Sequence, residues 1–227
     1  MKTSNIFISV LATTILIGMV VTNLILKNEC LKININDPFK SYVSIEFEPY
    51  SVLDISGSNG YPIEILAKEN EDVKVLRSRL EHFKSEVIND TLFIQFTGSN
   101  VSMKQSFLST TPSGIIIHKK NLSRIITSDT HNRVSGYSNQ DLTLKIKGNS
   151  YVEVSNVNLQ SLNVLMNKSS QIAFTKENQV DSINLIMNNA TVAHLEKIKF
   201  SNITHKLSDS ITLVLSKNTF TNLINKK

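Results

Sequence analysis

The chain of 227 residues contains one cysteine, four prolines, seven glycines and no tryptophan. A single cysteine, Cys30, excludes a disulfide framework within the chain and any metal site built from several cysteines. The low glycine and proline counts exclude collagen-like and linker-like chains. Because 41% of the residues are hydrophobic and only 19% are charged, a disordered polyelectrolyte is excluded as well. The length suits one ordinary domain, or one domain and a short second one.

The net charge of +5 does not indicate a nucleic-acid partner. Proteins that bind nucleic acid usually gather Lys and Arg on one surface and often interleave aromatic residues for stacking. Here the basic residues are spread thinly, and arginine occurs only at positions 77, 79, 124 and 133. We therefore expect no nucleic acid among the partners.

A long apolar run near the N-terminus predicts a membrane anchor. Residues 4–26 contain no ionisable side chain, and about 20 apolar residues span the hydrocarbon core of a bilayer. A cleaved signal peptide is the alternative, but the run exceeds the usual signal core of about 7–15 residues and no small-x-small cleavage site follows it. We predict an uncleaved signal anchor within residues 1–30, with the lipid bilayer as the partner of residues 4–26.

The orientation follows from the short tail that precedes the run. This tail carries Lys2 and the free amine, and such a tail is most simply the cytoplasmic end. The rest of the chain would then lie outside the cytoplasm of a bacterium, in the periplasm, behind a single membrane pass. Cys30 would sit at the outer membrane edge, either as a site of lipid attachment or intermolecular disulfide formation, or as an incidental interfacial residue.

The second half of the sequence repeats with a period of 20 or 21 residues. Each repeat opens with a stretch whose apolar residues alternate, as expected for a β-strand with one buried face. These stretches start at Leu142, Leu162, Ile183 and Ile203. A second alternating stretch follows ten residues after each start, and turn-forming residues stand between the two. A third apolar position ends each repeat, at Leu159, Val180, Phe200 and Phe220.

Two or three short strands in about 20 residues, without a helix, predict an all-β fold of the parallel β-helix type. Successive coils would pair about 4.8 Å apart, and inward residues would stack in apolar ladders. A meander of antiparallel hairpins would explain the alternation but not the recurring turns. We predict a β-helical domain over residues 31–227, with regular coils over 115–225 and an irregular first half over 42–110.

In the irregular half, shorter signals predict strands at 43–47, 52–56, 63–66, 73–76, 92–96 and 115–117. Leu76, Leu80 and Phe83 have the spacing of one helical turn. Residues 97–114, rich in Ser, Thr, Gly and Pro, predict a loop between the two halves.

Four segments together resemble a known bacterial family. They are residues 62–66 (Pro-Ile-Glu-Ile-Leu), 73–76 (Val-Lys-Val-Leu), 87–96 (Val-Ile-Asn-Asp-Thr-Leu-Phe-Ile-Gln-Phe) and the repeat at 141–154. This pattern resembles the head GIN domain, also called the auto-transporter adhesin domain, over roughly 42–225. The resemblance implies a pectin-lyase-like β-helix in the cell envelope, with an adhesive role and no catalytic residues. Lys168 and Asn189 depart from the small Gly or Ser that the family favours in its turns.

Catalytic signatures are missing from the sequence. It has no Gly-x-Ser-x-Gly elbow, no His-Glu-x-x-His zinc helix and no glycine-rich phosphate loop. A polysaccharide lyase on this scaffold would need clustered carboxylates for calcium and a basic residue. Only one carboxylate occurs in each of two candidate ladders, which are Gly148, Lys168, Asn189 and Asp209, and Asp141, Ser161, Ser182 and Asn202. We therefore predict no catalytic, metal-binding or cofactor-binding residues, and the ligand-binding residues stay unassigned.

The histidines are scattered at His82, His118, His131, His194 and His205. His205 takes an inward position in its repeat, so we expect it to be buried and hydrogen-bonded near the end of the stack. His118 and His131 are expected to flank a turn and to face solvent. The five tyrosines, at 42, 50, 61, 137 and 151, share no spacing, so packing rather than sugar binding is expected of them.

The sequence thus predicts a membrane-anchored, extracytoplasmic β-helical domain with a structural, adhesive or ligand-binding role, and not an enzyme. The repeats would supply long, flat faces suited to contacts with glycans or envelope proteins. Two alternatives are a degenerate polysaccharide-active enzyme of the lyase type and a component of an envelope sensor.

Overall fold

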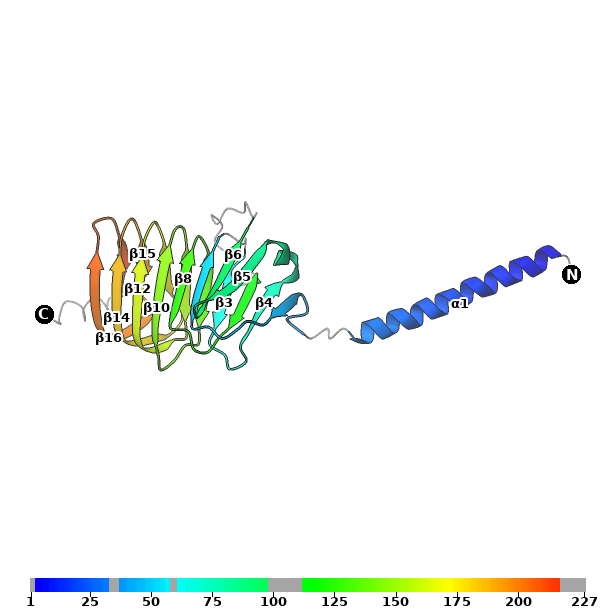
Figure 1. Ribbon diagram of the computed structural model, residues 1–227, viewed down its shortest axis with the longest axis horizontal. Coiled ribbons are helices and arrows are strands. Elements are labelled where there is room, and N and C mark those ends of the chain that lie inside the picture. The colour runs from blue at the N-terminus through cyan, green and yellow to red at the C-terminus, as the bar shows by residue number, and fades with distance from the viewer. Residues whose placement is uncertain (1–2, 33–36, 58–60, 98–111, 217–227) are drawn as a thin grey trace. The chain divides into compact units, whose positions relative to one another are not determined.

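The computed structural model describes residues 3–32, 37–57, 61–97 and 112–216 (Figure 1). The chain forms two compact units, Met1–Ser41 and Tyr42–Lys227. The first contains one helix, and the second contains the strands.

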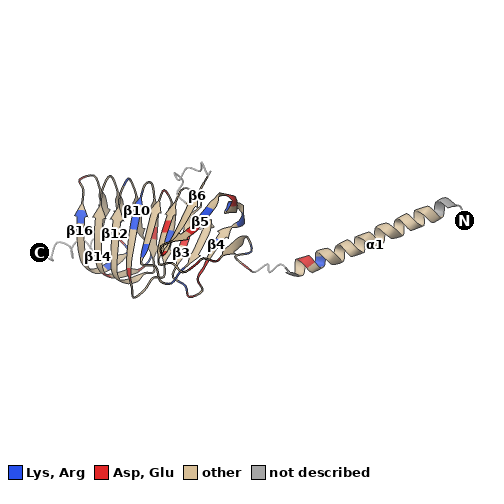
Figure 2. Cartoon of the chain, viewed as in Figure 1, with Lys and Arg blue, Asp and Glu red and all other residues tan. Residues whose placement is uncertain are grey.

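Helix α1 (Thr3–Lys32) contains one span, Ile6–Leu31, that is long and apolar enough to cross a membrane. At 1.5 Å per residue its 26 residues extend about 39 Å, more than the ~30 Å hydrocarbon core. The hydroxyls of Thr13, Thr14 and Thr22 donate to carbonyls one turn earlier at 2.8–2.9 Å, which satisfies the polar groups of an apolar helix. Figure 2 shows no charged residue over most of α1. A membrane anchor and a signal sequence share these properties.

The described strands of the second unit form a parallel β-solenoid of two sheets. Each regular coil contributes one strand to an eight-stranded sheet and the next strand to a nine-stranded sheet. The coil strands of the eight-stranded sheet are β10 (Asp141–Lys147), β12 (Asn158–Met166), β14 (Asn178–Met187) and β16 (Ile198–Leu207). Those of the nine-stranded sheet are β11 (Tyr151–Ser155), β13 (Gln171–Phe174), β15 (Val192–His194) and β17 (Thr212–Val214).

The pairing register confirms the predicted repeat. All of these strands pair in parallel, and the positions that were equivalent by sequence lie side by side. The inward ladders include Leu142, Leu162, Ile183 and Ile203, and Ile146, Met166, Met187 and Leu207. This parallel register contradicts a meander of antiparallel hairpins. Phe220 and the end of the predicted coils lie outside the described residues.

The turns that follow β10, β12 and β14 share a left-handed residue. Gly148, Lys168 and Asn189 have φ values of 62°, 58° and 54°. At Gly148 a Cβ atom would lie 2.3 Å from the Asp129 carboxylate, so a larger residue there would have to displace that side chain. Lys168 and Asn189 adopt the same conformation, at a cost of about 1–2 kcal/mol for the lysine. Their departure from the family pattern therefore leaves the turn intact.

Buried Asn178 accommodates the one change of period from 20 to 21 residues. Val154 pairs with Phe174, 20 positions on, whereas Leu159 pairs with Val180, 21 positions on. The extra residue thus lies between 174 and 178. The Asn178 amide donates to the carbonyls of Thr175 and Lys197, at 3.0 and 3.2 Å, and accepts from the backbone of Val157. Because this side chain replaces backbone bonds that the wider corner loses, the coils above and below stay in register.

The first half of the solenoid does not stack in chain order. Its strands are β2 (Val52–Ser56), β3 (Ile63–Leu66), β6 (Thr91–Phe96), β7 (Ile115–His118), β8 (Arg124–Ser128) and β9 (His131–Ser135). In space β2 lies between β6 and β8, and β3 lies between β7 and β9. The coil of β2 and β3 comes first in the chain, but the coil of β6 and β7 stacks on its outer side. After β7 the chain crosses back past β2 and β3, and β8 and β9 stack on their other side (Figure 1).

Antiparallel strands border this outer coil. β1 (Tyr42–Ile45) pairs with β4 (Asp72–Leu76), β4 pairs with β7, and β5 (Phe83–Ile88) pairs with β6. The spacing of Leu76, Leu80 and Phe83 corresponds to a short 3₁₀ helix, η1 (Arg77–His82). Strands β5, β8 and β9 were not predicted. Of the predicted loop at 97–114, residues 98–111 lie outside the described part.

The inward ladder generates a stability prediction. Met166 is 1% exposed in the core, so Met166→Asp would bury a carboxylate without a partner and lower the free energy of unfolding by about 3 kcal/mol or more. Gln160→Asp, at an exposed position of the same strand, should change it by less than about 0.5 kcal/mol. Urea denaturation measures both variants. Equal losses would contradict the assignment of inward and outward positions.

Candidate functional site

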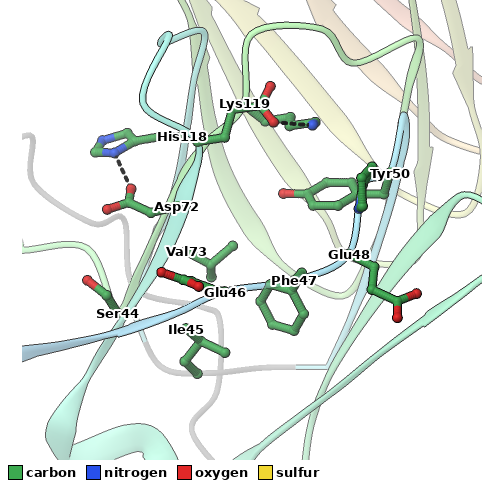
Figure 3. A pocket seen from close by; sticks show the side chains of 12 residues that line it. Ser44, Ile45, Glu46, Phe47, Glu48, Tyr50, Asp72, Val73, His118 and Lys119 are labelled. Carbon is green, nitrogen blue, oxygen red and sulfur yellow. Dashed lines mark hydrogen bonds and ion pairs between the residues drawn. The ribbon is translucent and has the colours of Figure 1, made fainter.

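A cleft of about 490 Å³ lies at the antiparallel end of the nine-stranded sheet (Figure 3). It is formed by β1 with the segment that follows it, by the start of β4 and by the end of β7. Its lining residues are Ser44, Ile45, Glu46, Phe47, Glu48, Pro49, Tyr50, Glu71, Asp72, Val73, His118 and Lys119.

A histidine–carboxylate pair lies on one side of this cleft. His118 Nδ1 is 2.6 Å from Asp72 Oδ1, because antiparallel pairing sets the two residues opposite each other on β7 and β4. Burial lowers the pKa of His118, although its bond to Asp72 opposes the shift. Burial also disfavours ionised Asp72, yet hydrogen bonds from Lys74 and His118 hold its pKa below the usual value. The pair therefore favours neutral imidazole beside ionised carboxylate.

A buried lysine lies on the other side of the cleft. Lys119 is 8% exposed, pairs with Glu71 and places its ammonium 4.9 Å from the centroid of the Tyr50 ring. The hydroxyl of buried Tyr137 donates to the Lys119 carbonyl at 3.0 Å. Burial, with a smaller effect of Glu71, raises the pKa of Tyr50 well above its usual value, so this ring stays neutral. The lysine is thus fixed by a carboxylate and an aromatic face.

The groups left to meet a ligand are at the mouth of the cleft. Glu46 and Glu48 are exposed, and Phe47 between them is half-buried. An Asp–His pair could activate a nucleophile only within hydrogen-bond reach of the imidazole. Among the lining residues the one aliphatic hydroxyl belongs to Ser44, and Figure 3 shows it apart from the His118 ring. The cleft has the features of a binding surface.

Two of the histidine predictions were wrong in the same direction. His118 and His131 were expected in solvent at a turn, but each is 5% exposed. They belong to strands β7 and β9, with the unpredicted strand β8 between them. The His131 ring packs edge-on against Tyr151 at 4.9 Å, and burial, with a smaller effect of Arg133, lowers the pKa of His131 to about 4.

The third histidine prediction failed in the opposite direction. His205 pairs with Leu185 as expected, but it is exposed rather than buried. Its strand β16 is at an edge of the eight-stranded sheet. A neighbouring coil therefore packs on His205 from one side only among the described residues. Of the other residues singled out, Cys30 is exposed near the end of α1, Asp141 is exposed at the start of β10, and Asp209 is exposed in the turn after β16. Among the described residues, no group of three His, Cys, Asp or Glu side chains could hold a metal ion.

Comparison with solved structures supports the fold. No protein-family model and no curated protein matches the sequence. A “putative adhesin” from Bacteroides fragilis superposes with a TM-score of 0.53 at 15% identity, over 79% of this chain and 95% of that one. A “putative adhesin” from Parabacteroides distasonis gives 0.47 at 13% identity, over 77% and 80% of the two chains. A “putative cell adhesion protein” from Clostridium sporogenes gives 0.33 at 11% identity, over 78% and 99%. The first of these similarities shows that the chain shares its fold with an adhesin-like protein.

The pKa of His131 generates a prediction for the pH dependence of stability. Because the folded state lowers this pKa from 6.5 to about 4, folding favours the neutral ring, and its contribution is complete above pH 6.5 and lost as the pH falls toward 4. At about 1.4 kcal/mol per pKa unit, this one group should cost about 2 kcal/mol between pH 7 and pH 5. Denaturation of wild type and His131→Gln at both pH values measures the difference. An identical pH dependence in the two proteins would contradict the assignment.

Proposed function

We propose that this chain is a membrane-anchored, non-catalytic binding protein of the head GIN type, displayed outside the cytoplasm of a bacterium for adhesion. The observation that supports adhesion is the register of the solenoid. Stacked coils place equivalent outward residues in straight rows on a flat sheet, and such rows can meet an extended partner at many points.

One of these rows crosses the eight-stranded sheet through Thr143, Asn163, Asn184 and Thr204. The Asn184 amide donates to Asn163 Oδ1 at 3.3 Å, and the Thr204 hydroxyl donates to Asn184 Oδ1 at 3.1 Å. These bonds fix the side chains at the strand spacing and limit the entropy that binding would cost. A glycan or an envelope protein with a matching repeat is the class of partner that we propose for this face.

The apolar helix supports the membrane part of the proposal. Residues 1–30 would form the anchor and its flanks, and residues 31–227 the displayed domain. With Lys2 and the free amine ahead of the span, the N-terminus would stay in the cytoplasm and the solenoid would lie in the periplasm.

Topology is tested with a reporter fused after Lys227. Alkaline phosphatase, which folds only in an oxidising compartment, should be active there, and the fusion should remain in the membrane pellet after a carbonate wash. A cytoplasmic reporter such as green fluorescent protein fused at the same place is the control. An inactive phosphatase would reverse the orientation, and release into the soluble fraction would indicate cleavage of the helix.

Adhesion without turnover is tested on the full chain in lipid nanodiscs. We expect it to bind at least one member of an array of cell-surface glycans and envelope proteins, and to release no unsaturated products from pectin or alginate with calcium present. Empty nanodiscs are the control for binding. Calcium-dependent cleavage would replace the adhesive function with that of a lyase, and the absence of any bound partner would contradict adhesion.

A further inference from the structure

The β5–β6 hairpin carries two exposed apolar side chains on the outer face of the eight-stranded sheet. Ile88 is 45% exposed and Phe93 is 37% exposed, and in the described part of the solenoid these are the large hydrophobic residues most open to solvent. Phe93 points outward because its neighbours Leu92 and Ile94 fill the core. The Phe93 ring thus lies on the outer face at mid-strand, with about a third of its surface open to solvent.

The register surrounds this ring with polar groups. Glu86 on β5 lies directly opposite Phe93 on one side, and Asp54 on β2 lies opposite on the other. Facing residues of an antiparallel pair such as β5 and β6 have Cβ atoms about 4.5–5.5 Å apart, and neighbouring strands in general lie about 4.7–4.9 Å apart. Along β6, Thr91 and Gln95 occupy the outward positions two residues before and after the ring. Phe93 is therefore the centre of a small array with a carboxylate on each side.

The surface around the array is hollowed into a groove of about 490 Å³. Its walls come from three strands, and two further groups in it, Lys84 and Ser56, can donate hydrogen bonds. The lining residues are Asp54, Ser56, Lys84, Ser85, Glu86, Phe93, Ile94 and Gln95. This groove is on the other sheet from the cleft that contains His118.

We propose that this groove binds a neutral saccharide, with one C–H face of a sugar ring packed on Phe93 and its hydroxyls bonded to Asp54 and Glu86. The electron-rich face of an aromatic ring attracts polarised C–H groups, and the ring offers apolar area at little entropic cost. Carboxylates accept charge-assisted hydrogen bonds from hydroxyls, whereas Gln95 and Lys84 donate to the sugar oxygens. The inference rests on the proposed adhesive function and assigns it a ligand class and a place.

The charge of the groove favours a neutral ligand over a cation. Burial raises the pKa of Asp54, while nearby Lys147 and Lys145 act in the opposite direction. Lys84 stands in the same groove as Glu86. Because cations lie near both carboxylates, a lysine or arginine of a partner would meet like charge, and a polyhydroxylated ligand would not.

The test uses the full chain in nanodiscs and a printed array of neutral hexose and pentose oligosaccharides, followed by calorimetric titration of the strongest binder. Phe93→Ala should weaken binding at least tenfold, and Phe93→Trp should retain it. Asp54→Asn should weaken binding several-fold. Ile88→Ala is the matched control, because it removes the other exposed apolar side chain of the hairpin, outside the groove, and should leave affinity unchanged. Equal thermal unfolding midpoints show that the variants are folded.

Four results would overturn the proposal. Saccharide binding that survives Phe93→Ala would place the sugar elsewhere and leave adhesion intact. Binding of a lysine-rich peptide, lost in Phe93→Ala, would make the groove a site for cationic protein segments. Binding of envelope proteins without binding of any saccharide would remove the ligand class but not the adhesive function. If neither class binds, both the subsite and the proposed function fail.

Discussion

Parallel pairing between coils in a fixed register is the constraint on which the structure depends. A slip of one residue would turn the apolar side chains of a strand from the core to solvent. Each coil must therefore begin its strands in the same register as the coil before it. The left-handed turns at Lys168 and Asn189 keep this register at one corner, and the amide of Asn178 keeps it at the corner with an extra residue. Because the register is kept, the outward residues also form straight rows, and these rows are the surfaces available for binding.

The sequence was sufficient to predict the regular coils, because the alternation of apolar residues leaves few other registers. It was not sufficient for β8 and β9, where inward Thr127 and Asn132 interrupt the apolar alternation. Nor does any local signal reveal that β2 lies between β6 and β8, since neighbours in a stack are set by packing and not by chain order. The cleft at His118 and the groove at Phe93 were missed for this reason. Asp72 and His118 are 46 positions apart in the chain, and Asp54 pairs with Phe93, 39 positions on. The apolar Phe93 at an outward position of an alternating strand was the one signal available.

The cleft at His118 and the groove at Phe93 are both at the end where the chain departs from the regular coil. There the strands pair antiparallel, β1 with β4, β4 with β7 and β5 with β6, whereas the regular coils pair in parallel. In the His118 cleft, Asp72 pairs with His118 and Glu71 pairs with Lys119, whereas the polar groups of the Phe93 groove lie on the outward face of the sheet. A scaffold of repeats with an irregular end suits the proposed role of a binding protein displayed beyond a membrane.

The stacking order is measured most directly by distances between spin labels in a Cys30→Ser background. Labels at Asp54, Glu86 and Lys206 would lie in one outward row, which crosses the strands β5, β6, β2, β8, β10, β12, β14 and β16. At about 4.8 Å per strand, pulsed electron resonance should give about 34 Å between 86 and 206 and about 24 Å between 54 and 206. Asp54 would thus be nearer to Lys206 than Glu86 is, although it comes earlier in the chain. A longer distance from 54 than from 86 would mean that the coils stack in chain order, and it would contradict this account of the fold and of both hollows.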